Sequence, residues 1–188
     1  MKNQSYQNKK GYFTTQQLVL VALFIALHLA FGNLPKIKTP LFEMGWGFIA
    51  TTLSAAICGP LPTLFISVFA DLLDIFLLRG GTNFFIGFTL SAGLAGIIYA
   101  VGLYRQQWTL RRVFLTVLVV TLIPNVLLNT LWVHILYGKA IMVLLPVRIS
   151  KNLISLVVNT AVLYYLLNNE HIKRLIVRYQ FPKFNLKK

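Results

Sequence analysis

The sequence predicts an all-α integral membrane protein with six transmembrane helices in one bundle and both termini in the cytoplasm. Hydrophobic residues make up 57% of the 188 positions, and charged residues only 12%. The mean hydropathy is +0.71. Such a composition is far from that of a soluble domain. The third observation is that basic residues gather between and beyond the apolar stretches, as they do in the loops of membrane proteins.

Six apolar stretches approach the length of about 20 residues that a helix needs to cross a bilayer. They run over 17–31, 46–58, 61–78, 85–104, 113–137 and 141–167, and the short second stretch has 43–59 as its wider extent. They leave no room for a second folded domain. We therefore expect a cytoplasmic N-terminal segment over 1–16, a transmembrane domain over 17–168 and a basic cytoplasmic tail over 169–188.

The orientation follows from most of the 18 Lys and Arg residues. Before the first stretch, between the fourth and fifth, and after the sixth lie Lys2, Lys9, Lys10, Arg105, Arg111, Arg112, Lys173, Arg174, Arg178, Lys183, Lys187 and Lys188. The excess of positive charge on cytoplasmic loops then places both termini inside. This distribution argues against a nucleic-acid partner despite the net charge of +14, and it predicts the lipid bilayer as the partner of the basic tail.

Catalytic and metal-binding motifs are missing from the sequence. Cys58 is the only cysteine, so neither an intramolecular disulfide nor a cysteine metal cluster can form. His28, His134 and His171 have no partner at metal-ligand spacing, and we expect them to form hydrogen bonds. A phosphate loop, a nucleophile elbow and an H-E-x-x-H pair are also absent. We therefore expect no enzyme activity, no cofactor and no metal.

Three pairs of polar residues lie inside the apolar stretches, each pair three positions apart and so on one helix face. The pairs are Asp71 and Asp74, Asn129 and Trp132, and Arg148 and Lys151. Counted from the outer helix ends, all six lie about 6 to 15 Å deep. A charge near the bilayer centre costs about 2.5 to 3.5 kcal/mol, so this polar layer predicts a binding pocket in the outer half. The alternative is an ion pair between Asp and Arg that only holds helices together.

Aromatic residues and a proline accompany this layer. Phe85 and Phe88, with Trp46, could cover a flat ring in the pocket, although such residues also form the aromatic belt at the membrane interface. Pro146 precedes Arg148 by two positions and frees a backbone carbonyl, which is tolerated where a helix lines a cavity.

Two further segments predict a lid over the pocket and a contact surface on the first helix. The connection 32–45 is too long for a minimal loop and predicts either a lid over the pocket or a surface linker. Ala22, Ala26 and Ala30 recur every fourth residue and form a smooth stripe, which lets another helix approach closely. Such a stripe serves a partner protein or ordinary packing inside the bundle.

Four segments carry a resemblance to a known family. They are Ala-Asp-Leu-Leu-Asp at 70–74, Phe-Ile-Gly-Phe-Thr-Leu-Ser-Ala at 85–92, Leu-Asn-Thr-Leu-Trp at 128–132 with Tyr-Gly-Lys at 137–139, and Arg-Ile-Ser-Lys-Asn at 148–152. On these the chain resembles the substrate-binding S components of energy-coupling-factor (ECF) vitamin transporters, most closely the folate-specific member. The Arg-Gly-Gly-Thr-Asn run at 79–83 departs from relatives, which often carry a proline-containing turn there.

The resemblance implies a six-helix, high-affinity binding protein of a bacterial cell membrane, without ATPase activity. Such a protein captures its vitamin outside and associates with a transmembrane T subunit and two cytoplasmic ATPases. The family's Ala-x-x-x-Ala element, which docks onto the T subunit, corresponds to Ala22, Ala26 and Ala30. The resemblance also implies that the protein topples within the membrane to release the ligand.

For folate, the implied binding residues are Asp71, Asp74, Phe85, Phe88, Asn129, Trp132, Arg148, Lys151 and Asn152. A pteridine edge suits Asn129 or Asp74, its ring suits stacking on Trp132 or Phe88, and the glutamate carboxylates suit Arg148 and Lys151. Another vitamin or precursor, such as thiamine or a deazapurine, is the main alternative, and a cationic ligand would make Asp71 and Asp74 the key pair. Two other readings are a small polytopic membrane enzyme using those two carboxylates and a purely structural subunit.

Overall fold

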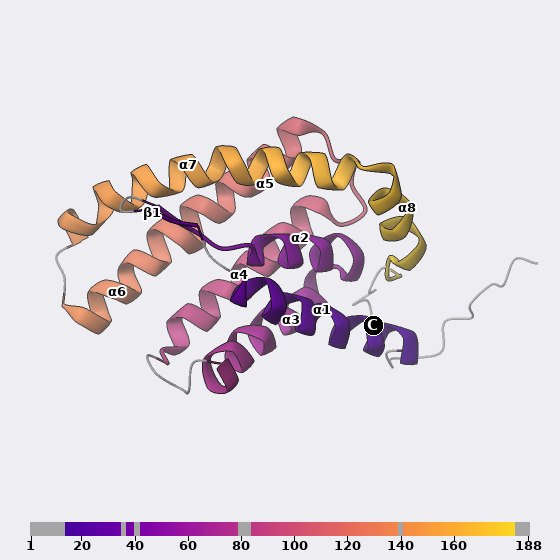
Figure 1. The fold of residues 1–188 in the computed structure, drawn as a ribbon, viewed down its shortest axis with the longest axis horizontal. Coiled ribbons are helices and arrows are strands. Elements are labelled where there is room, and N and C mark those ends of the chain that lie inside the picture. The colour runs from indigo at the N-terminus through magenta and orange to yellow at the C-terminus, as the bar shows by residue number, and fades with distance from the viewer. Residues whose placement is uncertain (1–13, 35–36, 40–41, 79–83, 139–140, 183–188) are drawn as a thin grey trace, which may run out of the picture.

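The computed structural model describes residues 14–34, 37–39, 42–78, 84–138 and 141–182. Its helices form one bundle (Figure 1). In chain order they are α1 (Thr15–Asn33), α2 (Gly47–Cys58), α3 (Pro60–Leu73), α4 (Ile86–Leu103), α5 (Leu110–Val120), α6 (Asn129–Tyr137), α7 (Ile141–Asn168) and α8 (Glu170–Tyr179). Two π-helical segments continue these helices, η1 (Asp74–Leu78) after α3 and η2 (Thr121–Leu128) between α5 and α6.

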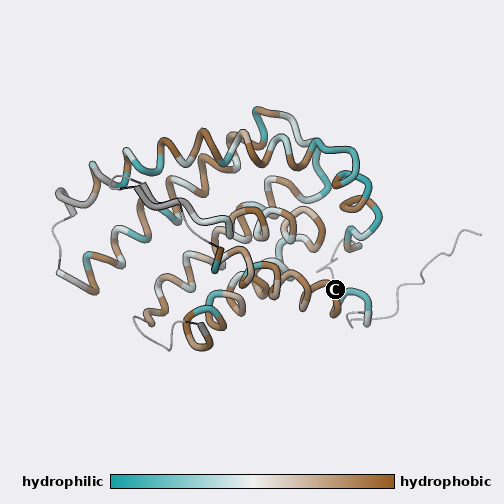
Figure 2. The backbone as a smooth tube through the Cα atoms, viewed as in Figure 1, coloured by the Kyte–Doolittle hydropathy of each residue, from teal (hydrophilic) through white to brown (hydrophobic). Residues whose placement is uncertain are grey.

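Within the described ranges, five helical stretches are long and apolar enough to cross a membrane. They are Thr15–Asn33, Pro60–Leu77, Ile86–Leu103, Leu110–Leu136 and Arg148–Asn168. Figure 2 shows hydrophobic residues along all of them, whereas α8 and the connection before α5 are largely hydrophilic. Large apolar side chains are exposed on these stretches, such as Leu127 and Val157. The predicted all-helical membrane fold is therefore confirmed, with five helices of spanning length.

The remaining predicted span corresponds to α2, which has only 12 residues. At 1.5 Å per residue it measures about 18 Å, less than the roughly 30 Å hydrocarbon core. Most of its side chains, from Ala50 to Cys58, are buried. Because α2 is enclosed by other helices, the bilayer thickness does not set its length. Gly59, with a φ of 83° that favours glycine, ends the helix, and Pro60 begins α3.

Glycines on α4 let its neighbours approach closely. A Cβ added at Gly96 would lie 2.5 Å from Ser67 Oγ on α3, and one at Gly93 would lie 2.8 Å from Leu64 Cδ1 on the same helix. Packing between small residues is the usual way in which helices associate in a membrane. The α3–α4 contact is consequently tight, and it holds the polar residues of α3 against the first turns of α4.

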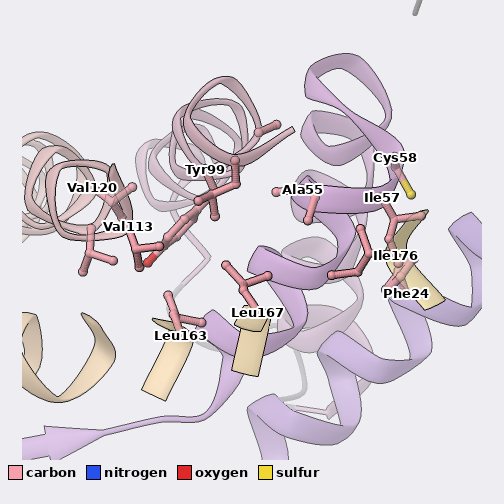
Figure 3. Packing of buried hydrophobic residues seen from close by; sticks show 14 of the residues in the cluster. Phe24, Ala55, Ile57, Cys58, Tyr99, Val113, Val120, Leu163, Leu167 and Ile176 are labelled. Carbon is pink, nitrogen blue, oxygen red and sulfur yellow. The ribbon is translucent and has the colours of Figure 1, made fainter. Parts of the chain in front are cut away.

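The hydrophobic core lies toward the end of the bundle where α8 folds back. Figure 3 shows Ile176 of α8 beside Phe24 and Ile57, with Leu163 and Leu167 of α7 packed nearby. Beyond α8, the backbone N–H of Phe181 donates to the Ile57 carbonyl over 2.9 Å. The packed structure thus extends past residue 168, the predicted end of the transmembrane domain, and the tail is part of the fold as far as Phe181.

A short β-ribbon lies in the connection between α1 and α2. Strand β1 (Ile37–Thr39) pairs antiparallel with β2 (Phe42–Met44) in the register Ile37↔Met44, Lys38↔Glu43 and Thr39↔Phe42. Strand β2 contacts α7, and Figure 1 shows the ribbon beside that helix. This connection is the predicted lid, although its residues 35–36 and 40–41 lie outside the described residues, and its role as a lid stays a prediction.

Candidate binding site

Two carboxylates at the end of α3 are held by neighbouring helices. Thr89 Oγ1 on α4 donates to Asp71 Oδ2 over 2.7 Å. Asn33 Nδ2 at the end of α1 donates to Asp74 Oδ1 over 3.4 Å. Both carboxylate residues are half-buried. Asp71 is thus held by α4 and Asp74 by α1, and the Asp71 carboxylate keeps lone pairs for a ligand.

A histidine on α1 bonds to the neighbouring helix α2. His28 Nε2 is 2.9 Å from Thr51 Oγ1. The predicted hydrogen-bonding role of His28 is confirmed. Sequence reasoning gave no site role to Asn33, Thr89 or His28. Their single available signal was a polar side chain inside or at the end of an apolar stretch.

An aromatic cluster stands beside the carboxylates, built from the start of α4 and from α6. The Phe85 ring is 5.9 Å from the Phe88 ring, edge to face, and 5.7 Å from the Trp132 ring, tilted by 57°. Trp132 Nε1 donates to Ser91 Oγ over 2.9 Å, which orients the indole. Gly87 leaves space for this arrangement, because a Cβ there would lie 2.6 Å from Trp132 Cδ2.

The amide of Asn129, one turn before Trp132, lies in the same part of the bundle. Its Oδ1 is buried and makes no hydrogen bond to any residue of the described chain, and the same holds for Thr130 Oγ1. A buried polar atom without a partner costs about 1 to 3 kcal/mol. Such atoms indicate a ligand or water that completes their hydrogen bonding.

The π-helix η2 decides which way Asn129 and Trp132 face. It runs over Thr121–Leu128 and contains Pro124. A π-helical turn holds more residues than an α-helical turn, so everything after it is rotated relative to an uninterrupted α-helix. Segments of this kind occur frequently at functional sites. η1, which begins with Asp74, has the same effect at the end of α3.

The basic residues of α7 form a second group. Arg148, Lys151 and Asn152 are all half-buried, and Asn152 Nδ2 donates to the Arg148 carbonyl over 2.8 Å. The Asp71 carboxylate accepts from Thr89 of α4 and the Asp74 carboxylate from Asn33 of α1. The Asp–Arg ion pair considered from the sequence stays an alternative prediction.

The predicted site residues lie on four helices, and their arrangement in one polar layer stays a prediction. The carboxylates and the aromatic rings share α3, α4 and α6, whereas the cations belong to α7. Within the described residues, no group of three or more His, Cys, Asp or Glu side chains could hold a metal ion. The 79–83 segment, at which the sequence departs from relatives, lies outside the described residues.

The alanine stripe faces away from the bundle. Ala22, Ala26 and Ala30 are all exposed, and Phe24 is the one buried side chain of α1. Since the three alanines are exposed and not covered by another described helix, packing inside the described bundle does not explain the stripe. Its docking role stays a prediction.

The matches to known proteins agree with this architecture. The family described as "ECF transporter, substrate-specific component" matches residues 16–167. The chain belongs to this family. The predicted resemblance is thereby confirmed, and the family is one of transporters and not of enzymes.

Curated relatives are named folate transporter FolT. The protein from Clostridium novyi is 34% identical over 147 residues, which cover 78% of this chain and 85% of that protein. The protein from Leuconostoc mesenteroides is 31% identical over 162 residues, covering 83% of this chain and 86% of that one. A solved structure, described as FolT bound with folic acid, superposes with a TM-score of 0.74 and 30% identity over 81% of this chain and 93% of that chain.

Proposed function

We propose that this S component binds folate with high affinity at the extracellular side of a bacterial cell membrane. In this proposal it delivers folate inward together with a T subunit and two ATPases. The observation that carries the proposal is the likeness to a folate-bound protein over 93% of that protein's length. The absence of a nucleotide-binding loop from the sequence agrees with separate ATPase partners.

The two groups of side chains suit the two ends of folate. The rings of Phe85, Phe88 and Trp132 offer flat apolar surfaces on which a pteridine can stack. The carboxylates of Asp71 and Asp74 and the unpartnered amide oxygen of Asn129 can accept hydrogen bonds from its amino groups. The pterin would then lie between α3, α4 and α6.

The cations of α7 suit the glutamate end. A guanidinium can bind a carboxylate with two parallel hydrogen bonds, and Arg148 is half-buried on α7. Lys151 would add a second positive charge, and Asn152 an amide. A ligand long enough to contact both groups would connect α7 with α3, α4 and α6.

The orientation and the partner surface complete the proposal. The basic α4–α5 connection and α8 lie at the opposite end of the bundle from the aromatic cluster, so the positive-inside bias puts the site outside and both termini inside. The six spans of the proposal are the five stretches of spanning length and the shorter helix α2. The exposed stripe Ala22, Ala26 and Ala30 would contact the T subunit, because small side chains permit close approach of a second helix.

Titration of folate against the purified protein in mild detergent tests the proposal. We expect saturable binding without ATP, and thiamine should not compete. Transport into proteoliposomes should require added T subunit and ATPases. Competition by thiamine at concentrations similar to folate would favour the alternative ligand, and ATP-driven uptake by this chain alone would overturn the assignment to an S component. Unchanged binding after chelator is added would exclude a metal-dependent site.

A further inference from the structure

A hollow of about 780 Å³ lies at the end of the bundle opposite to the candidate binding site. α4 connects the two places, because its first turns carry the aromatic cluster and its last residue, Leu103, leads into the wall of the hollow. The folate proposal gives this hollow no role.

Three segments far apart in the sequence form its walls. The α4–α5 connection, the end of α7 and α8 contribute the lining residues used below, Arg105, Gln107, Trp108, Tyr164, Lys173 and Val177. Hydrogen bonds within the chain fix this shape. Trp108 Nε1 donates to the Leu103 carbonyl over 3.0 Å, and Asn168 Nδ2 donates to the Trp108 carbonyl over 3.1 Å.

The charge of the hollow is positive. Arg105 and Lys173 line it, and its lining includes no acidic residue. Glu170, one turn before Arg174 on α8, is paired with that arginine at 3.1 Å and so does not neutralise Lys173. Arg105 uses one N–H group on the Phe181 carbonyl, over 2.8 Å. Its other guanidinium donors remain for an anion.

The hollow also borders the lipid-facing surface. Trp108, Tyr164 and Val177 give it apolar and aromatic walls. Leu110, at the start of α5, and Tyr165 of α7 are exposed directly beside it in sequence. A ligand that fits both halves carries a negative headgroup and apolar chains. Basic pockets between helices at the cytoplasmic face of membrane proteins bind lipids of this type.

We propose that this hollow binds the phosphate headgroup of an anionic phospholipid such as phosphatidylglycerol. Arg105 and Lys173 contact the phosphate, and the acyl chains run along the exposed apolar side chains of α5 and α7. The glutamines and Asn168 supply polar contacts to the rest of the headgroup. This site is independent of the ligand that the opposite end of the bundle takes.

Native mass spectrometry of delipidated protein, titrated with phosphatidylglycerol or phosphatidylcholine, tests this proposal. We expect phosphatidylglycerol to bind more tightly. Lys173→Gln should weaken that binding about fivefold, as expected for one cation near a lipid phosphate. Gln107→Glu, which adds a negative charge without changing side-chain size, should weaken it by a similar factor. Arg178→Gln, which removes a charge of α8 outside the lining, should change it less than twofold.

Three results would overturn the proposal. Equal affinity for the two lipids would remove the role of charge, and an equal loss in Arg178→Gln would assign binding to the general surface. Displacement of phosphatidylglycerol by an equal concentration of inorganic phosphate would make the hollow a free-phosphate site. If Lys173→Gln and Gln107→Glu bind the lipid normally but no longer co-purify with the partner subunits, the hollow is a contact with those subunits. Folate affinity, measured on the same samples, should not change, so the two proposals fail separately.

Discussion

The hydroxyl of Tyr104 donates a hydrogen bond to the carbonyl of Phe181, and so joins the end of α4 to the C-terminal segment. Burial raises the pKa of Tyr104, although the charge of Arg105 opposes this shift. The phenol is therefore a neutral donor at physiological pH. With the guanidinium of Arg105 on the same carbonyl, this contact holds the residues after α8 against the end of α4.

Removing the Phe181 ring should destabilise the protein. Phe181 is 4% exposed and packs into the core, so Phe181→Ala should cost about 3 to 5 kcal/mol. Tyr104→Phe should cost about 0.5 to 1.5 kcal/mol, because Arg105 still satisfies the carbonyl. Thermal midpoints in detergent measure both effects. Tyr165→Phe is the control, since Tyr165 is 80% exposed, and an unchanged midpoint in Phe181→Ala would show that the C-terminal segment does not contribute to stability.

Arg148→Ala should weaken folate binding more than it weakens the fold. Loss of one charge-assisted contact is worth about 1.5 to 3 kcal/mol, or roughly a tenfold to hundredfold rise in Kd. Arg148→Lys should recover only part of this loss, because lysine lacks the planar fork. Tryptophan quenching reports the affinity, and the ligand-free thermal midpoint reports the fold. Ser150→Ala, an exposed position on the same helix, is the control. A lowered midpoint with unchanged affinity would make Arg148 a structural residue.

Gly87→Ala should disturb the aromatic cluster. The added methyl would lie 2.6 Å from Trp132 and 2.4 Å from Phe85, so at least one ring must move. We expect folate affinity to fall at least tenfold and the Trp132 emission to shift. Gly32→Ala provides a matched control, because nothing lies within 4 Å of a Cβ there. Equal affinities in the two variants would argue against a binding role for the cluster.

Ala26→Trp should prevent association with the T subunit and leave folate binding intact. Ala26 is exposed, so the larger side chain meets only lipid in the isolated protein and obstructs a second helix in the complex. Co-purification with tagged T subunit and ATPases measures this. Val157→Trp on α7, at a position that is 64% exposed, is the control. Full recovery of the complex with Ala26→Trp would show that the stripe is not the docking surface.

The helix layout follows from the sequence to within a few residues for most spans. The stretch 85–104 corresponds to Ile86–Leu103, and 17–31 to Thr15–Asn33. In lipid every backbone polar group must be satisfied internally, so a long apolar stretch has few alternatives to a helix. This rule could not predict α8, because α8 has no long apolar stretch. Its polar and apolar residues alternate at helical spacing, and its buried face is defined by contacts with α2.

The candidate site was predicted by residue type but not by arrangement. Asp71, Asp74 and Trp132 were found because polar or aromatic residues inside apolar stretches are conspicuous. Their partners Thr89 and Ser91 were not, since a threonine or serine in a membrane helix often bonds only to its own backbone. The prediction of one polar layer treated each span as a straight α-helix. It stays a prediction, and η1 and η2 rotate the residues that follow them.

By itself, the sequence determined the membrane class, the sites of the helices, the family and the residue types available for binding. Each of these depends on composition or on local spacing, which the chain carries in any conformation. Only the tertiary structure decided that α2 is enclosed, that Asp71 meets Thr89, that Trp132 meets Ser91, and that α8 closes a basic hollow. These are contacts between segments distant in the chain, and close packing of side chains and glycines, not sequence spacing, selects them.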